Sequence, residues 1–326
     1  MLGRKHIILI LVLPLMLCRA ELVRAQQGVM FSQYIFNGLV LNPAYAGYKE
    51  KFNAALVYRN QWVGIESAPT TITLMADATV LNNLIGIGGH IMSDKVGAQQ
   101  TLSIMTDYSY RLQLDKAGSR LALGLSIGLT QLSLDESLIQ FDDPNDPLIA
   151  SGLLGENFYR PDFNVGVFYD SKLVSAGLSL TELWGDYKIV KKSPQMYVTA
   201  SMLIPINRDF MIRPSLLYKD DFKMQPSVDI SAFGIIKDKF WVGLLWRNGL
   251  PFSGRLTKDV ANVRYQSSIN SITILLNWYI KPDLNIGYAW DVPLSKLNQV
   301  SLGSHEITLG FSLGKRAQRV LTPRYF

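Results

Sequence analysis

Large apolar residues alternate with small or polar ones along most of this chain. In residues 119–130, SRLALGLSIGLT, leucine or isoleucine occupies every odd position from 121 to 129, with Ala, Gly and Ser between them and Thr after the last. The same period of two recurs in LSIMTDYSYRL, ITILLNWYI and HEITLGFSL. Successive side chains of a β-strand point to opposite faces, so the pattern predicts strands with one apolar face and one small or polar face.

Fourteen segments follow this pattern, and the connections between them alternate in length. The segments start near Phe52, Thr70, Leu84, Thr101, Arg120, Asp162, Lys172, Gln195, Arg208, Pro226, Lys239, Ile269, Asp283 and Gly303. The first connections read QWVGIESAPT, NN, SDKVGAQ and DKAGS, and every even-numbered connection is tight. Short periplasmic turns and longer extracellular loops are typical of outer-membrane barrels, whereas a soluble sandwich has no reason to keep this asymmetry. We therefore expect an all-β fold over residues 52–313, a transmembrane antiparallel β-barrel of about fourteen strands in an up-and-down meander.

The N-terminus has the pattern of a secretory signal peptide over residues 1–25. Basic residues precede an unbroken apolar run over residues 7–17, which is too short to span a bilayer but suits a signal. Cleavage after Ala25 fits the small-residue rule, with Ala20 as the alternative. The single cysteine, Cys18, follows a leucine where a lipoprotein signal needs a small residue. We expect an exported chain whose mature part contains no cysteine.

Composition excludes several classes of protein. No mature stretch approaches the eighteen or more apolar residues of a membrane helix. The net charge of +6 is spread along the chain, which argues against nucleic-acid binding. We expect no cofactor, no metal and no small-molecule substrate, because His90 and His305 fit no metal-ligand or nucleophile motif. Ser304 and His305 are neighbours on a strand and face opposite sides, so they cannot act as a lipase pair.

Residues 26–51 form an irregular, aromatic segment before the first strand. The stretch VMFSQYIFNGLVLNPAYAGYK combines aromatic residues with glycine, asparagine and proline, which interrupt regular structure. An even number of strands puts both chain ends on the periplasmic side, so we expect this segment to start at the periplasmic mouth, and residues 314–326 to form a periplasmic tail. There the segment either folds into the lumen as a plug or docks a periplasmic partner. The residues that would carry either role are Phe31, Tyr34, Phe36, Asn42, Pro43 and Tyr45.

Charged residues also fall on inward-facing positions of the predicted strands. They are Arg59, Asp77, Asp107, Arg111, Arg213, Asp229, Arg247 and Glu306. Such groups line the water path of a diffusion channel or pair with a plug and loops. Aromatic residues toward the strand ends, Trp241, Trp246, Trp278 and Tyr279 among them, are expected in the girdles that mark the membrane interfaces.

Several separated motifs resemble those of one family. They are FSQYIFNGLVLNPAYAG, YRNQWVGIESAPTT, IGIGGHIMSDKVGAQQT, DKFWVGLLWRNG and LNIGYAWDVPLSKLNQVSLGSHEITLGF. In this order, from about Phe31 to the closing TPRYF, the chain is similar to the PorP/SprF family of type IX secretion system membrane proteins. One position differs, because Gly38 stands where the family often has proline.

The resemblance implies a non-catalytic outer-membrane barrel of a gliding bacterium or a relative, which supports export or surface anchoring of large adhesins. The partners it implies are membrane lipids, the C-terminal sorting domain of a secreted adhesin and periplasmic components of the type IX apparatus. Two alternatives from other classes stay open at this point. One is a diffusion channel or small-solute uptake barrel, and the other is an outer-membrane enzyme.

Overall fold

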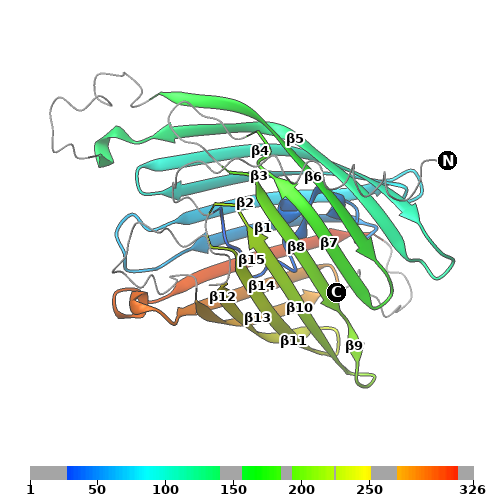
Figure 1. Cartoon of the computed structure of the whole chain (residues 1–326). Coiled ribbons are helices and arrows are strands. Elements are labelled where there is room, and N and C mark those ends of the chain that lie inside the picture. Colours follow the sequence, from blue (N-terminus) through cyan, green and yellow to red (C-terminus); the bar gives the residue numbers. More distant parts are fainter. Residues whose placement is uncertain (1–27, 140–155, 185–192, 224, 251–269, 315–326) are drawn as a thin grey trace, which may run out of the picture.

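The strands close into a single antiparallel barrel (Figure 1). The computed structural model describes residues 28–139, 156–184, 193–223, 225–250 and 270–314, so the expected signal peptide and nearly all of the expected tail lie outside the described residues. Each strand pairs with its neighbours in the sequence. The ring closes where β1 pairs with β15, from Phe52↔Leu313 to Asn60↔His305. This confirms the expected fourteen-stranded meander.

The strand bounds follow the sequence pattern closely. They are β1 Phe52–Asn60, β2 Thr70–Val80, β3 Ile85–Val96, β4 Gln99–Gln113, β5 Arg120–Leu134, β6 Asn157–Asp170, β7 Val174–Thr181, β8 Gln195–Met202, β9 Ile204–Pro205, β10 Phe210–Asp220, β11 Ser227–Ile236, β12 Phe240–Gly249, β13 Ser271–Lys281, β14 Leu284–Pro293 and β15 Ser304–Leu313. The two residues of β9 continue β8 beyond Leu203. The ladder breaks there because Pro214 on the facing strand has no N–H to donate.

Two expectations about the strand ends were wrong. The connection between β3 and β4 is only Gly97 and Ala98, because both strands continue to pair through residues assigned to a loop. Likewise β6 begins at Asn157, before the expected Asp162, and pairs with β5 up to Ser133. Cross-strand hydrogen bonds extend these hairpins beyond the alternating region. We call the rim where β1 ends the long-link rim and the rim where β1 begins the short-turn rim.

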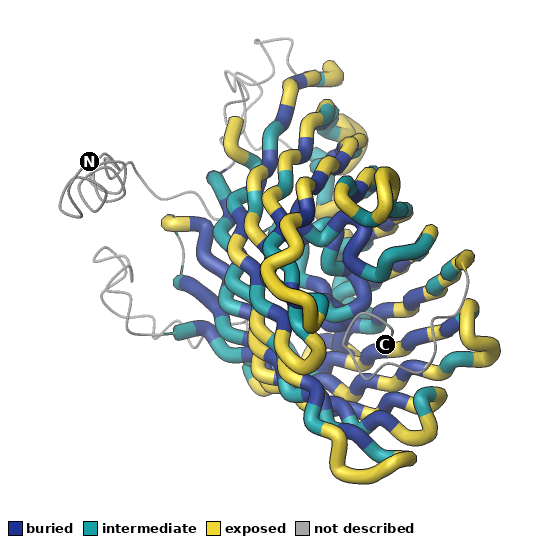
Figure 2. The backbone as a smooth tube through the Cα atoms, turned by 90° about the vertical axis from the view of Figure 1, so that its right-hand side faces the viewer, coloured by how far each residue is buried: buried dark blue, intermediate teal, exposed yellow. Residues whose placement is uncertain are grey.

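Burial alternates along each strand, with the exposed positions apolar and the buried positions largely polar or small (Figure 2). In β12 the exposed residues include Val242, Leu244 and Trp246, while Arg247 is buried. This is the reverse of a soluble protein, in which apolar residues are inside. Among the described residues, no helix is both long and apolar enough to cross a bilayer. In a membrane barrel, an outer face made of exposed apolar residues is the surface that meets lipid.

The outer aromatic residues gather toward the rims, with two exceptions to the sequence-based expectation. Phe240 and Trp278 stack on the outside near the short-turn rim, with ring centroids 6.0 Å apart. Trp241 was expected in a girdle but is fully buried inside the barrel, and Tyr279 packs against the same inner cluster. The alternation misleads at β12 because both of its faces carry large apolar residues.

An arginine at position 244 should destabilise the barrel strongly. Leu244 lies in the middle of β12 and is 62% exposed on the outer face. A charge near the bilayer midplane costs about 2–4 kcal/mol in such barrels, so Leu244→Arg should reduce the folded fraction in bilayers. The matched control is Leu302→Arg, in the link before β15, where an exposed leucine meets water. Folded fraction is measured by heat-dependent migration in SDS, and equal tolerance of both variants would contradict a lipid-facing Leu244.

Candidate functional site

The segment before β1 crosses the inside of the barrel from one rim to the other. This lumen segment comprises residues 28–50. At its start, Lys219 Nζ donates to the carbonyl of Gly28 at 2.6 Å, next to the end of β10 at the long-link rim. At its end, the carboxylate of Glu50 lies 3.6 Å from Arg111 near the short-turn rim. The segment therefore begins at the long-link rim and reaches the short-turn rim, which is the one expected to be periplasmic, only where it enters β1.

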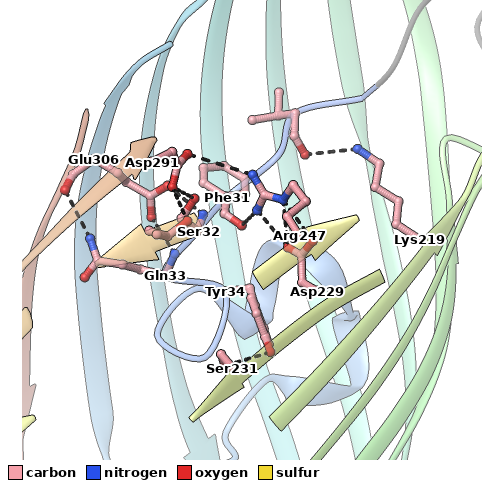
Figure 3. A network of polar contacts seen from close by, with 12 residues as sticks. Phe31, Ser32, Gln33, Tyr34, Lys219, Asp229, Ser231, Arg247, Asp291 and Glu306 are labelled. Carbon is pink, nitrogen blue, oxygen red and sulfur yellow. Dashed lines mark hydrogen bonds and ion pairs between the residues drawn. The ribbon is translucent and has the colours of Figure 1, made fainter. Parts of the chain in front are cut away.

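The first part of the lumen segment is held mainly through its backbone (Figure 3). The N–H groups of Ser32 and Gln33 donate to the two carboxylate oxygens of Glu306, at 2.8 and 2.9 Å. The carbonyl of Phe31 accepts from the Arg247 guanidinium at 3.1 Å. Hydrogen bonds between charged side chains and backbone groups are among the stronger ones in proteins. The barrel wall thus fixes the path of this part of the chain.

Two side chains of the lumen segment add specific contacts. Ser32 Oγ donates to Asp291 at 2.7 Å and accepts from Arg59 at 3.1 Å, which uses the hydroxyl in both directions. Gln33 Nε2 donates to the backbone carbonyl of Glu306 at 3.2 Å. The wall therefore accommodates a hydroxyl followed by an amide.

The charges around this part form a buried cluster on the wall itself. Arg59 and Glu306 face each other across β1 and β15 at 2.9 Å, and Arg59 also reaches Asp291 at 2.6 Å. Arg247 and Asp229 face each other across β11 and β12 at 2.7 Å. Strand register alone thus sets two of these pairs. All five side chains are at most 5% exposed, and buried charges require such partners.

Below the charged cluster, Tyr34 reaches two serines of the wall. Its hydroxyl shares hydrogen bonds with Ser215 on β10 at 2.8 Å and with Ser231 on β11 at 3.2 Å. Burial raises the pKa of Tyr34 to about 12, against the smaller opposing effect of these two hydrogen bonds. The phenol therefore stays neutral and keeps its proton for hydrogen bonding.

Phe36 packs into an aromatic pocket on the inner wall. Its ring lies 6.0 Å from that of Phe233 and 5.3 Å from that of Trp241. Phe233 and Trp241 also contact each other edge to face, at 5.6 Å. Burial of such a side chain contributes about 1.5–3 kcal/mol. This half of the inner wall is apolar and would be exposed without the lumen segment.

Three inward glycines, on β3, β5 and β6, let the middle of the lumen segment lie directly against the wall. A Cβ added at each would come within 2.0 Å of an atom of the segment: the carbonyl oxygen of Ala46 at Gly86, the backbone nitrogen of Ala44 at Gly124, and Oδ1 of Asn42 at Gly166. Real Cβ atoms do not approach so closely. We call this surface the glycine trench, and no larger residue fits it without moving the segment.

Asn42 and Pro43 shape the turn that lies in the glycine trench. The carboxamide of Asn42 accepts from the N–H of Ala44 at 2.9 Å, which caps the short 3-10 helix η2 Pro43–Tyr45. Its NH₂ group donates to the carbonyl of Val167 on β6 at 3.0 Å. Proline suits the first helical position because its fixed φ matches and no N–H is needed there. Asn42 therefore joins the turn to the wall.

The end of the lumen segment packs with its aromatic side chains against β6. Tyr45 and Tyr48 lie 5.5 and 5.2 Å from the ring of Phe168, and 4.7 Å from each other. Gly47, with a φ of 74°, donates its N–H to Asp77 at 2.8 Å. A short α-helix, α2 Gly38–Leu41, precedes this part. The segment thus contacts strands around the whole ring.

The structure places all eight charged residues expected to face inward inside the barrel. They do not form one site. Four belong to the charged cluster, and Asp77 binds the lumen segment. Asp107 lies 2.9 Å from His90, and the guanidinium of Arg213 donates to Ser201 at 3.2 Å.

Sequence reasoning missed Ser32, Gln33, Lys219 and Asp291 as parts of the site. The sequence could have indicated Asp291, because it lies an even number of positions from Asn285 on β14 and so points to the same, inner face. Ser32 and Gln33 had no such signal, since their partners Glu306 and Asp291 are more than 250 residues away. Within the described part of the chain, no group of His, Cys, Asp and Glu side chains is arranged to hold a metal ion.

Comparison with solved structures returns barrels of low sequence identity. BamA from Haemophilus ducreyi lacking POTRA domains 1–3 is 13% identical, with a TM-score of 0.46 over 80% of this chain and 70% of that chain. Omp33 from Acinetobacter baumannii is 7% identical, with a TM-score of 0.46 over 81% of this chain and 100% of that chain. A mutant of the Rh. blastica porin is 8% identical, with a TM-score of 0.35 over 81% and 99%.

Comparison with protein families gives a match over most of the chain. No curated protein matches the sequence. The family described as type IX secretion system membrane protein PorP/SprF matches residues 23–311, which include the lumen segment and nearly the whole barrel. This barrel with its apolar outer face is an outer-membrane protein, and the chain belongs to the PorP/SprF family of type IX secretion system membrane proteins.

Proposed function

We propose that this chain is a closed, non-catalytic barrel of the type IX secretion machinery that supports export or surface anchoring of large adhesins with C-terminal sorting domains. Family membership supports the link to type IX secretion. The observation that carries the closed state is the lumen segment, whose residues contact β3, β5, β6, β10, β11, β12, β14 and β15. A wide barrel needs such a filling to exclude an aqueous path.

The burial of the lumen segment favours a plug over a docking site for a periplasmic partner. Phe31, Tyr34 and Phe36 are all at most 9% exposed, and they face the barrel wall rather than the periplasmic side. Tyr45 lies partly buried beside Tyr48. Aromatic anchors of an interface must be accessible to the partner, so these residues serve to hold the segment in place. We propose that the machinery and its cargo engage the rims of the barrel instead.

A diffusion channel is the second candidate, and inward charges are what would favour it. In the described barrel, Arg59, Asp229, Arg247 and Glu306 pair with one another and with the lumen segment. Charged side chains that form ion pairs with one another and hydrogen bonds with the lumen segment do not line a water path. The same arrangement gives no nucleophile with an adjacent base, so we propose no catalytic role.

Surface display of an adhesin tests the proposed function. In cells that lack this chain, an adhesin with a C-terminal sorting domain should no longer be labelled by antibody on intact cells, and the wild-type chain should restore labelling. An adhesin with its sorting domain removed is the control and should stay unlabelled in both strains. Unchanged display together with reduced uptake of small solutes would contradict the proposal and favour the diffusion channel.

A further inference from the structure

We infer that the inner wall at the long-link rim is a peptide-binding site, occupied in this structure by residues 28–33 and open to exchange with a peptide that arrives from the cell surface. The inference deepens the proposed function, on which its cellular meaning rests. We call this surface the peptide cradle. It comprises Arg59, Lys219, Asp229, Arg247, Asp291 and Glu306.

The peptide cradle recognises mainly backbone groups. Lys219 Nζ donates to the carbonyls of Gly28 and Val29, at 2.6 and 3.4 Å. Arg247 donates to the next carbonyl but one, and Glu306 accepts from the two N–H groups that follow it. Such contacts depend on the path of the backbone, which bends at Ser32 so that two successive N–H groups meet one carboxylate, rather than on most side chains. A peptide from another protein can therefore make the same contacts.

The peptide cradle keeps its charge balance without its occupant. Three basic side chains face three acidic ones, and register alone sets the pairs Arg59–Glu306 and Arg247–Asp229. Residues 28–33 bring only neutral groups, GVMFSQ. Departure of this peptide takes no charge away from the cradle, and the Arg59–Glu306 and Arg247–Asp229 pairs stay intact. A plug that supplied counter-charges would leave buried charges unpaired on departure. A site that is organised before binding also binds its ligand with less loss of freedom.

Residues 34–50 of the lumen segment, in contrast, cannot leave the barrel easily. They are wedged into the glycine trench, and the acidic side chain of Glu50 contacts Arg111. Their aromatic rings fill the apolar side of the lumen. Residues 34–50 are thus a fixed part of the barrel, and exchange is confined to residues 28–33.

The chemistry of the cradle defines the partner. It fits a neutral peptide that bends at the hydroxyl residue, in which an aromatic residue precedes a hydroxyl and an amide. Phe31 is 3% exposed, Ser32 Oγ is bound by Asp291 and Arg59, and the Gln33 amide donates to a wall carbonyl. Because Gly28 lies at the long-link rim, and long links are extracellular in such barrels, the peptide arrives from the cell surface. We assign it to a secreted protein handled by the machinery.

Binding of a synthetic peptide to a shortened chain tests this inference. The variant lacks residues 28–33 and keeps residues 34–50, and the probe is the peptide GVMFSQ with an amidated C-terminus and a fluorophore coupled to its N-terminal amine. Fluorescence anisotropy in detergent should show binding to the variant and none to the full chain at the same concentration. Heat-dependent migration in SDS confirms that the variant is folded. A folded variant that does not bind the peptide would overturn the inference.

N-methylation of the peptide gives a control that leaves the protein unchanged. A methyl group on the nitrogen of Ser32 removes one donor to Glu306 and should weaken binding about tenfold or more. The same group on the nitrogen of Met30 controls for altered backbone flexibility and should weaken it less. Equal loss from both would contradict recognition by Glu306.

If the deletion variant does not fold, a full-length variant provides a second test of peptide binding. Ser32→Pro removes the same backbone N–H from the resident peptide, so the added peptide should compete better than it does with the wild-type chain. Peptide binding can succeed or fail whatever the adhesin display shows, so failure of the inference and failure of the proposed function are distinguishable.

Discussion

Removal of residues 29–48 is expected to convert a closed barrel into an ion-conducting one. The deletion removes no strand, and the pairing of β1 with β15 starts after it, at Phe52. Backbone pairing within the ring is what lets a barrel persist in lipid, so the variant should still resist SDS until heated. In planar bilayers its conductance should exceed that of the wild-type chain by about tenfold or more, because the lumen of a barrel of this size is open unless it is filled.

The deletion should also have a measurable cost. It exposes the inner pocket of Phe233 and Trp241, which now packs against Phe36. The folded yield should therefore fall, although the barrel closes. Leu302→Ser, in an exposed link, is the control and should change neither yield nor conductance. A folded deletion variant that stays closed to ions would show that the lumen segment does not close the lumen.

Substitution of Gly124 by valine should displace the lumen segment without any deletion. A Cβ at this position would lie 2.0 Å from the backbone nitrogen of Ala44 and 2.5 Å from its Cα. Backbone atoms cannot rotate away, so the turn at residues 42–46 must leave the glycine trench. Overpacking of this kind typically costs about 1–3 kcal/mol, occasionally more. We expect conductance to rise and residues 28–50 to become sensitive to protease.

Gly177→Ala provides the matched control for this substitution. Gly177 also faces Asn42, but an added Cβ would meet only side-chain atoms, the nearest of them Thr199 Oγ1 at 2.8 Å. Side chains can move by a few tenths of an ångström, so this variant should stay closed. If Gly177→Ala opened the barrel as much as Gly124→Val, general loosening of the wall would account for both, and the glycine trench would not.

The sequence alone determined the barrel, because strand alternation is a local property. The starts of β1, β2, β5 and β8 agree with the expected positions, since large and small residues alternate from the first paired residue. The alternation of inner and outer positions along β12 likewise predicted that Arg247 points into the barrel. Trp241 lies on the same face by this alternation, yet the apolar residues on both faces of β12 made a girdle position equally acceptable. Local pattern fails where both faces of a strand are apolar.

Only the tertiary structure decided the path of the lumen segment. Composition marked Phe31, Tyr34 and Phe36 as unusual, but it gave neither the rim at which the segment starts nor its partners. The glycine trench forms from residues 86, 124 and 166, which become neighbours when β3 to β6 pair side by side, and it meets residues 42–46 only when the lumen segment lies inside the barrel. Ser32 likewise meets Glu306 only across 274 positions of the chain. Contacts at such separation depend on how the whole sheet closes, and no periodicity in the sequence encodes them.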